Sequence, residues 1–365
     1  MHSLKLTDIC DYTACRTTVF ENYISTENML PNKGGICAPS NIPNGSAIEY
    51  KVGDILISNI RPYFQKIWQA KCDGACSADV LCIRSKSNVD SRYLYYMLSQ
   101  QAFFDYVMSG AKGCKMPRGD KKQIMQWKIS LPSLEEQRKI ANFLSSIDEK
   151  IELNRRINDN LEQQAQALFK SWFVDFDTIK LGDVVTTTSG GTPSRKYPEY
   201  YDGNYGWVKS KELNGSFIIG TEEKITEQAI SKSAAKMLPE KSVLIAMYGA
   251  TVGQYALLSS PMSCNQAVCA LLPNENYPYT YLFMFAKNKK EELINKAVGS
   301  AQQNISQVLI KDLDISNDIL KIKQFHTIVN PFFETIEKNQ QEITRLTTLR
   351  DTLLPKLMSG DIAIE

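Results

Sequence analysis

Basic and amide side chains gather in a few loops of this 365-residue chain, and their types suit contacts with nucleic acid. Residues 59–66 read Asn-Ile-Arg-Pro-Tyr-Phe-Gln-Lys, and residues 112–122 contain five basic residues against one acidic residue. Lysine and arginine bind phosphates, arginine also reads guanine, and asparagine and glutamine form paired hydrogen bonds with adenine. These two loops are therefore expected to contact DNA.

The second half of the chain offers loops of a different composition. Residues 189–196 read Ser-Gly-Gly-Thr-Pro-Ser-Arg-Lys, residues 248–254 are mostly small and polar, and residues 300–307 are rich in amides. A single polar loop is more often only a solvated turn, so the expectation rests on the whole set. The residues expected to contact DNA are Asn59, Arg61, Tyr63, Lys66, Lys112, Lys115, Arg118, Lys121, Lys122, Thr192, Ser194, Arg195, Lys196, Trp207, Lys209, Tyr248, Thr251, Gln254, Gln302, Gln303 and Asn304.

These loops lie in two copies of one unit. Gly53-Asp-Ile-Leu-Ile-Ser58 matches Lys241-Ser-Val-Leu-Ile-Ala246, and Cys76-Ser-Ala-Asp-Val80 matches Cys264-Asn-Gln-Ala-Val268 at the same offset along the chain. Aliphatic and β-branched runs of this kind are typical of buried strands. We predict an α/β domain with a curved or mixed sheet in each half, over residues 1–132 and 177–318. Shared frames that carry different loops allow a binding scaffold to change its target.

Each copy closes on a long helical segment, over residues 133–176 and 319–365. A proline stop and the potential N-cap Ser133 precede Glu135 and Glu136, which suit the first helical turn. Apolar residues then recur four and three apart over about four heptads, which predicts a coiled coil. We expect the two helices to pair antiparallel within the chain. A helix of about 40 residues spans about 60 Å, so the pair would hold the domains at a fixed distance.

Asparagine interrupts the apolar seam of each helical segment. Asn154 and Asn339 occupy equivalent positions when the two segments are aligned. A seam asparagine lowers stability but fixes register, because only an aligned partner satisfies its amide. We expect Asn154 and Asn339 to meet near the crossing of the helices and to set their register. The alternative is that both side chains point to solvent at the edge of the seam.

Composition indicates a soluble, cytoplasmic protein. The net charge is +2, no apolar stretch approaches the length of a membrane span, and the first residues lack a signal peptide's apolar core. Nine cysteines are an odd number without disulfide-framework spacing, and the two histidines add little to any zinc site. We therefore expect free thiols in a reducing compartment, no metal and no membrane partner.

Two other classes of protein, an adenine methyltransferase and a coiled-coil adaptor, fit the sequence less well. An adenine methyltransferase needs an Asn/Asp-Pro-Pro-aromatic tetrapeptide, and the nearest match, Asn330-Pro-Phe-Phe333, lies inside the second helical segment with phenylalanine at the second proline. The sequence also contains no ATP-binding Gly-x-x-x-x-Gly-Lys-Ser/Thr motif and no clustered catalytic carboxylates. We expect neither catalysis nor a cofactor. A coiled-coil adaptor for proteins would explain the helices, but not the basic loop of residues 112–122.

Several stretches resemble the specificity subunit of a type I restriction-modification system. They are Leu56-Ile-Ser-Asn-Ile-Arg-Pro-Tyr-Phe64, Leu131-Pro-Ser-Leu-Glu-Glu-Gln-Arg-Lys-Ile140, Ser189-Gly-Gly-Thr-Pro-Ser194 with Trp207, Gly249-Ala-Thr-Val-Gly253 with Asn265-Gln266, and Leu354-Pro-Lys-Leu-Met-Ser-Gly360. The resemblance spans essentially the whole chain, and the alternation of domains and helices is more specific than any one stretch. Residues 14–35 lack the Gly-Gly-Thr-Pro feature of the second copy, which suggests that the two domains read different sequences.

The resemblance implies a division of labour. Each domain would be a target-recognition domain for one half of a split DNA sequence, and the helices would set the gap. The chain would assemble with two modification (methyltransferase) subunits, and with ATP-dependent restriction subunits in the full complex. The methyltransferase would flip the target adenine out of the stack, so this chain would itself be a non-catalytic subunit.

Overall fold

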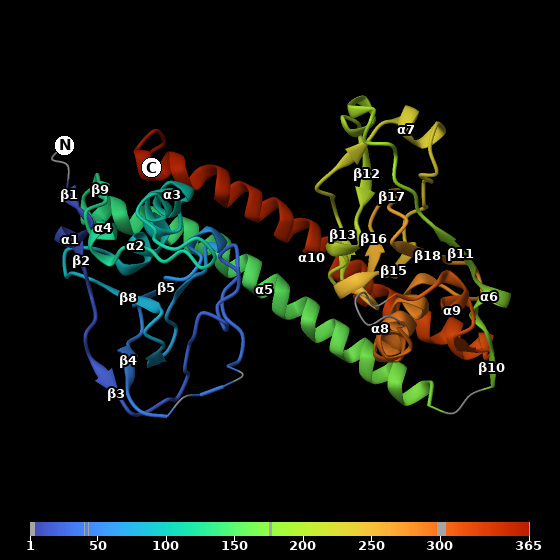
Figure 1. The fold of residues 1–365 in the computed structure, drawn as a ribbon. Coiled ribbons are helices and arrows are strands. Elements are labelled where there is room, and N and C mark those ends of the chain that lie inside the picture. Colours follow the sequence, from blue (N-terminus) through green and yellow to red (C-terminus); the bar gives the residue numbers. More distant parts are fainter. Residues whose placement is uncertain (1–3, 40, 43, 175–176, 298–303, 365) are drawn as a thin grey trace. The chain divides into compact units, whose positions relative to one another are not determined.

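The computed structural model describes residues 4–39, 41–42, 44–174, 177–297 and 304–364, and its chain divides into two compact units (Figure 1). The first unit is Met1–Lys150 together with Leu346–Glu365, and the second is Ile151–Arg345. Each unit contains one α/β domain and parts of two long helices, α5 (Leu134–Trp172) and α10 (Ile319–Ser359). The α/β class predicted for both halves is thereby confirmed.

The first domain is built on an antiparallel sheet of four strands in the order β2-β8-β5-β6. A second sheet has the order β3-β4-β7, and β1 pairs with β9 to close the domain. The elements are β1 (Leu4–Lys5), α1 (Leu6–Ile9), β2 (Cys10–Tyr12), β3 (Arg16–Thr17), β4 (Ala47–Tyr50), β5 (Ile55–Ser58), η1 (Pro62–Phe64), β6 (Ile67–Gln69), β7 (Gly74–Cys76), β8 (Val80–Ser85), α2 (Ser91–Leu98), α3 (Gln101–Ser109), α4 (Lys121–Ile124) and β9 (Lys128–Ile129).

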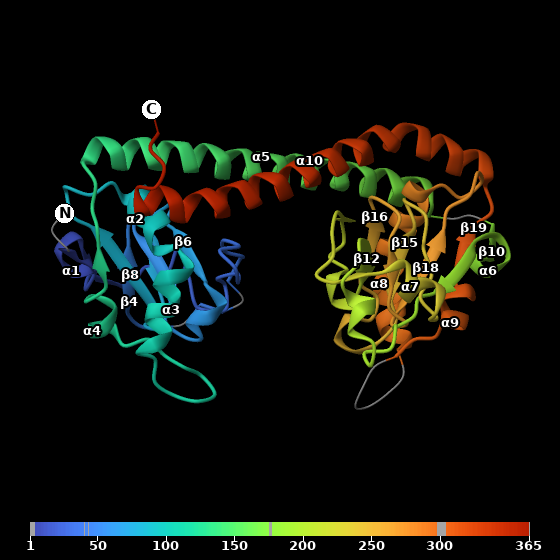
Figure 2. The ribbon, with the colours of Figure 1, turned by 90° about the horizontal axis from the view of Figure 1, so that it is seen from above.

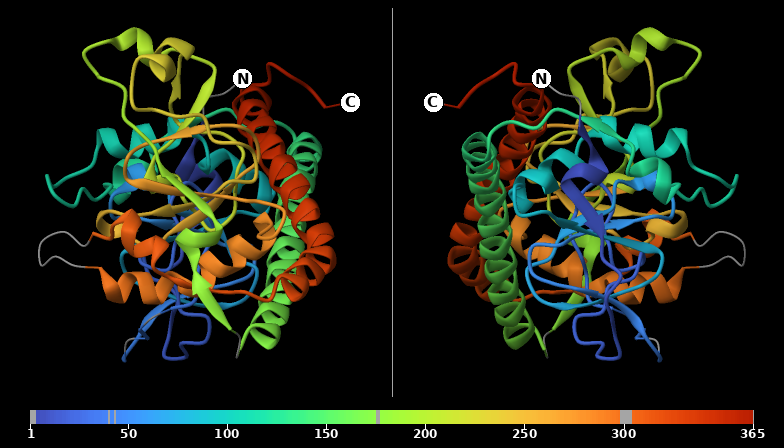
Figure 3. Two further views of the ribbon diagram at one scale, coloured as in Figure 1. Left: turned by 90° about the vertical axis from the view of Figure 1, so that its right-hand side faces the viewer. Right: turned by 90° about the vertical axis from the view of Figure 1, so that its left-hand side faces the viewer.

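The second domain repeats this plan with an extra strand, in a sheet of order β11-β18-β15-β16-β13. A smaller sheet, β14-β12-β17, forms with α7 a lobe that projects from the larger sheet (Figure 3). The elements are β10 (Thr178–Lys180), α6 (Leu181–Val184), β11 (Thr186–Ser189), η2 (Pro198–Tyr201), β12 (Tyr205–Val208), η3 (Ser210–Glu212), β13 (Phe217–Ile218), β14 (Lys224–Ile225), α7 (Glu227–Ser231), β15 (Val243–Ala246), η4 (Gly249–Thr251), β16 (Tyr255–Leu258), β17 (Ser263–Cys264), β18 (Val268–Leu272), α8 (Tyr279–Lys296), α9 (Gln307–Lys311) and β19 (Asp314–Ser316).

The two central sheets share one register. Leu56 lies opposite Cys82 where β5 pairs with β8, and Leu244 lies opposite Ala270 where β15 pairs with β18. Both residues of the second pair lie at the repeat offset from their counterparts, so the sequence repeat is also a repeat of strand pairing. The copies differ in their helices, because the segment 91–109 forms α2 and α3 whereas the second domain has the single helix α8.

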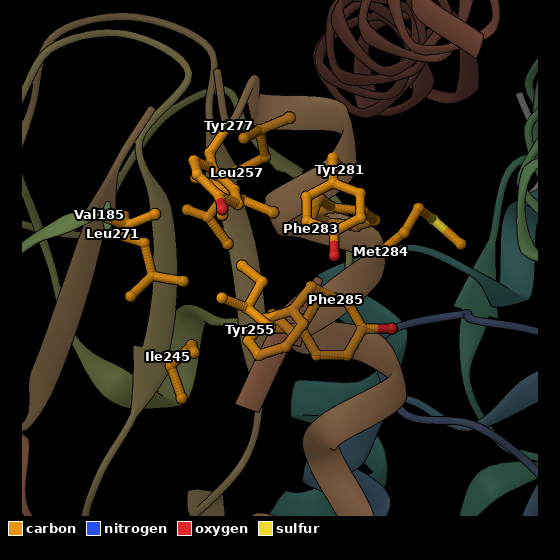
Figure 4. Packing of buried hydrophobic residues seen from close by; sticks show 14 of the residues in the cluster. Val185, Ile245, Tyr255, Leu257, Leu271, Tyr277, Tyr281, Phe283, Met284 and Phe285 are labelled. Carbon is orange, nitrogen blue, oxygen red and sulfur yellow. The ribbon is translucent and has the colours of Figure 1, made fainter. Parts of the chain in front are cut away.

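Both faces of each central sheet are buried. Side chains alternate between the faces of a strand, so Val243 and Ile245 join the core beneath α8 whereas Leu244 joins a separate core on the opposite face. Phe283 of α8 packs against this face of the sheet, with its ring centroid 5.2 Å from that of Tyr255 of β16, and Figure 4 labels both residues in this core. Burial on both faces explains why these strands are continuously apolar rather than alternating with polar residues.

The helix α5 begins where its capping residues predict. The Ser133 N–H donates to the Glu136 carboxylate at 3.0 Å, and the Glu136 N–H donates to the Ser133 hydroxyl at 3.3 Å. This reciprocal pair is a capping box, which satisfies backbone donors that a helix start leaves open. The predicted N-cap at Ser133 is thus present, and Figure 2 follows both long helices along their lengths.

Within the second unit, α5 and α10 run antiparallel, and polar side chains form hydrogen bonds between them. The Asn339 amide donates to the Asn158 side-chain oxygen at 2.8 Å, and the Asn154 amide donates to the Glu342 carboxylate at 2.7 Å. The expectation that Asn154 meets Asn339 is therefore wrong by about one helical turn. The alternative that both point to solvent also fails for Asn154, which is buried.

The seam also shifts where the helices meet the domains. The spacing of apolar residues four and three apart predicts Trp172 and Phe332 in the seam, but both are only partly buried, whereas Phe173 and Phe333 are buried. Phe173 packs 5.0 Å from Tyr281 of α8, measured between ring centroids. A heptad pattern describes contact with one helix, and here the ends of α5 and α10 must also cover a domain core.

Across the described ranges, no helix combines the length and apolarity needed to cross a membrane. The same part of the chain contains no group of three His, Cys, Asp or Glu side chains placed to hold a metal ion. All nine cysteines are free thiols, five of them buried.

Candidate nucleic-acid interface

The first domain brings its two candidate loops together at one end of the central sheet. Residues 59–66 follow β5, and Ile60 forms an isolated β-bridge with Arg118 from the loop of residues 112–122. The Arg61 N–H donates to the Pro117 carbonyl at 2.8 Å, and the Gly119 N–H donates to the Asn59 carbonyl at 3.3 Å. Backbone hydrogen bonds therefore join loops that lie far apart in the sequence.

The second domain joins its corresponding loops in the same way. Tyr248, which follows β15, forms an isolated bridge with Asn304, and the Ile305 N–H donates to the Met247 carbonyl at 2.9 Å. This bond corresponds to the one between Gly119 and Asn59. Tyr248 and Asn304 are exposed, whereas the predicted contacts Gln302 and Gln303 lie outside the described residues.

One turn conformation recurs in both domains. Arg61 and Gln65 flank the 3-10 turn η1 with φ angles of 50° and 51°. Their counterparts at the repeat offset are Gly249, the first residue of η4, and Gly253, two residues beyond the end of η4, with φ angles of 67° and 77°. A positive φ angle raises the free energy of a residue that has a side chain, whereas glycine adopts it without this cost. The two domains thus share a backbone turn whose conformation favours glycine, but only the second domain has glycine at these two positions.

The basic loop of the first domain contains both paired and unpaired cations. Arg118 lies 3.1 Å from the Asp79 carboxylate, and Lys112 lies 3.3 Å from Asp120. Hydrogen bonds from the Gln123 backbone N–H and the Lys112 ammonium group hold the pKa of Asp120 below its usual value. Within the described part of the chain, four exposed cations of these loops form no ion pair, namely Arg61, Lys115, Lys121 and Lys122. These four are available for an external anion.

The Gly-Gly-Thr-Pro stretch of the second domain packs inside the lobe. A Cβ on Gly191 would collide with the backbone carbonyl of Ala234, and the Trp207 indole N–H donates to the Gly191 carbonyl at 3.0 Å. The Thr192 hydroxyl is hydrogen-bonded to Gln266. Trp207 is buried, so it belongs to the interior of the lobe and not to an exposed reading surface.

Two cationic side chains of the lobe form ion pairs within the chain. Arg195 stacks 3.8 Å above the ring of Tyr201 and lies 2.6 Å from the Glu223 carboxylate, to which Lys209 also donates at 2.5 Å. Hydrogen bonds from Lys209 and then Arg195 hold the pKa of Glu223 below its usual value. Ser194 and Lys196 are exposed, so they remain the accessible polar candidates of this segment.

Several other predicted residues have internal partners. The Lys66 ammonium donates to the Thr26 carbonyl at 2.7 Å, the Thr251 hydroxyl donates to the Tyr248 carbonyl at 2.9 Å, and Gln254 accepts from Lys290 at 3.0 Å. Asn59 is 8% exposed, and its side-chain oxygen lacks a hydrogen-bond partner among the described residues. Tyr63, by contrast, is half exposed and lies 4.7 Å from the Phe64 ring.

Sequence reasoning missed two residues of the turn at residues 61–65, the exposed Phe64 and the partly buried Gln65, whose side chain bonds within the chain. Gln65 donates a side-chain hydrogen bond to Gln101 of α3. The sequence did contain a signal for this turn, because the repeat offset aligns Arg61 and Gln65 with two glycines.

Duplicated domains, each carrying an exposed polar turn at the same end of its central sheet, are typical of a protein that presents two related binding surfaces on one chain. The profile of the family described as Type I restriction modification DNA specificity domain matches residues 1–163 and 174–348. The chain therefore belongs to this family of DNA specificity proteins and contains two copies of its domain. The resemblance seen in the sequence, and the role in DNA target recognition, are confirmed.

Relatives of this chain carry matching names. It is 25% identical to the type I restriction enzyme HindI specificity subunit of Haemophilus influenzae, over 96% of each chain. It is 26% identical to the MjaIX specificity subunit of Methanocaldococcus jannaschii, over 77% of this chain and 71% of that one. The crystal structure of the S subunit from M. genitalium shares the fold, with a TM-score of 0.57 and 16% identity over 98% of this chain and 96% of that one.

The packing of Gly191 predicts that Gly191→Ala disrupts the second domain. Its methyl group would meet backbone atoms that cannot rotate away, so we expect destabilisation of about 2 kcal/mol or more. The matched control is Gly220→Ala, because an added Cβ at Gly220 meets nothing within 4 Å. Thermal unfolding of the two full-length variants measures the difference. Equal melting temperatures would show that the lobe relaxes around the added methyl group.

Proposed function

We propose that each domain reads one half of a split DNA sequence and that α5 and α10 fix the gap between the halves. The observation that carries this proposal is the shared turn of η1 and η4, which has the same bonded neighbours in both domains but different side chains. The same scaffold therefore presents two different chemical surfaces. Two different half-sites are the expected targets.

The proposed partners are two modification subunits, with restriction subunits in a larger complex. Two similar helical surfaces can seat two copies of one partner. Phe143 on α5 and Ile328 on α10 occupy equivalent positions, in the alignment that matches Asn154 with Asn339, and their side chains are 37% and 45% exposed. Exposed apolar side chains at matching places in the two helices support docking of one subunit on each.

Catalysis is assigned to those partners and not to this chain. The Asn330-Pro-Phe-Phe333 stretch lies inside α10, where the Asn330 side chain accepts a hydrogen bond from the Tyr279 hydroxyl at 2.8 Å and Phe333 is buried. Its residues are thus used for packing. The unpaired cations of the first domain favour a DNA reader over a coiled-coil adaptor for proteins.

Methylation mapping tests the proposed function directly. The full chain, co-expressed with its modification subunit in a host that lacks related systems, should direct adenine methylation to a two-part motif with one fixed gap. Co-expression without this chain is the control and should leave the host unmethylated. A stable complex that adds no methylation would favour the adaptor function.

The spacing role predicts a changed gap after matched deletions in both helices. Asn154 contacts Glu342 across the pair, so residues 151–157 lie opposite residues 339–345, and removing both segments takes equal lengths from the two helices. Seven residues rise about 10 Å and a base pair about 3.4 Å, so the gap should shorten by about two to three base pairs. The half-site sequences should stay the same. Methylation of the original motif at its original gap would rule out the spacing role.

The unpaired lysines predict a uniform loss of affinity in Lys121→Ala/Lys122→Ala. Each lost phosphate contact lowers the slope of log affinity against log salt by about 0.9, so the slope should fall by nearly two for every DNA sequence. The control is Lys51→Ala/Lys71→Ala, which removes the same charge at the opposite ends of β5 and β6. Salt titrations of DNA binding by the assembled complex give the slopes. A change in sequence preference would instead make these lysines base contacts.

A further inference from the structure

Arg61 occupies a backbone conformation that its side chain makes unfavourable. Its φ angle of 50° lies in the left-handed region, and the equivalent residue of the second domain is Gly249. The turn itself therefore does not need a side chain at this position. An arginine placed here raises the free energy of the folded chain relative to glycine.

Contacts within the chain do not compensate for that conformation. Arg61 is exposed, and in the described part of the chain its guanidinium forms no ion pair and no hydrogen bond. Gln65 differs, because its left-handed conformation comes with a side-chain hydrogen bond to Gln101 of α3. The neighbouring Arg118 is likewise committed, since it pairs with Asp79. Within the described ranges, Arg61 is thus the arginine of this turn that has no intrachain partner for its side chain.

The backbone around Arg61 is held on both sides. Its N–H donates to Pro117, the Phe64 N–H donates back to the Arg61 carbonyl at 3.0 Å, and the Asn32 N–H donates to the Phe64 carbonyl at 2.8 Å. A side chain on an anchored turn loses less entropy when it binds than one on a mobile loop. The exposed rings of Tyr63 and Phe64 stand beside it on the same turn.

We infer that Arg61 is a specificity-determining residue that reads a guanine in the half-site of the first domain. Arginine binds guanine through two parallel hydrogen bonds to O6 and N7, and this fork needs a fixed approach. Phosphate binding does not require a fixed approach, and Lys115, Lys121 and Lys122 already supply flexible cations for it. The inference rests on the proposed function and names the base that one of its turns recognises.

The second domain reads its half-site without this contact. Gly249 and Gly253 keep the turn but present no side chain at these two positions. The two half-sites should therefore differ in their dependence on these turn positions.

The test compares variants at the two left-handed positions of the first turn. Arg61→Gly and Arg61→Asn both fit the conformation, since glycine and asparagine tolerate it, and both remove the guanidinium. Gln65→Gly is the matched control, because it relieves the same backbone conformation but removes a side chain that bonds to α3. Each full chain is co-expressed with its modification subunit, and the methylated motif is mapped. Binding is then compared on duplexes that carry each single base-pair change in the motif.

The expected result is confined to one position. Both Arg61 variants should lose discrimination at a single G·C pair of one half-site, by about 10- to 100-fold, and keep the other half-site. Gln65→Gly should keep the complete motif. Thermal unfolding should show that Arg61→Gly is at least as stable as the parent chain.

Other outcomes would overturn the inference. Relaxation at an A·T pair, or a uniform loss of affinity with the motif intact, would make Arg61 something other than a guanine reader while leaving the proposed function in place. A parent complex that methylates no split motif would overturn the proposed function, and the assignment of Arg61 with it.

Discussion

The burial of both faces of each central sheet is the constraint on which the remaining structure depends. β5 and β15 have apolar side chains on two sides, so a slip of the register would move core residues of one face into the other. The fixed register determines where each strand ends, and the polar turns of residues 61–65 and 249–253 follow β5 and β15 directly. Exposed polar residues are thus placed by buried apolar residues of the strands before them.

The long helices combine this apolar burial with a polar contact. In the second unit, Phe325 and Val329 are fully buried against the domain, whereas Asn158 and Asn339 bond to each other further along the pair. Apolar packing supplies most of the free energy and tolerates sliding, and a buried amide pair does not. The register of the helix pair is therefore expected to depend on this amide pair more than on the apolar contacts. This register-setting role remains a prediction.

The sequence alone predicts the strands that recur in both halves and the helix start that is determined by neighbouring capping residues. The constant offset between matching stretches revealed the paired strands, and Ser133 with Glu136 marked the start of α5. The partner of Asn339 was not predictable, because heptad spacing gives the face of a residue but not its height along the neighbouring helix. Arg195 and Lys209 also resembled free cations, since their pairing with Glu223 depends on the folding of the lobe. Trp207 was expected to contact DNA, but it is buried, and its burial likewise depends on the folding of the lobe.

The second domain enters and leaves the helical scaffold through one short ribbon. β10 follows α5, β19 precedes α10, and the two strands pair antiparallel with Thr178 opposite Ser316. The two chain ends of this domain therefore lie side by side. Genetic recombination with both crossovers in the codons of this ribbon would replace the whole domain and leave α5 and α10 unchanged. A new DNA specificity could then arise in one step, without residue-by-residue redesign of a domain.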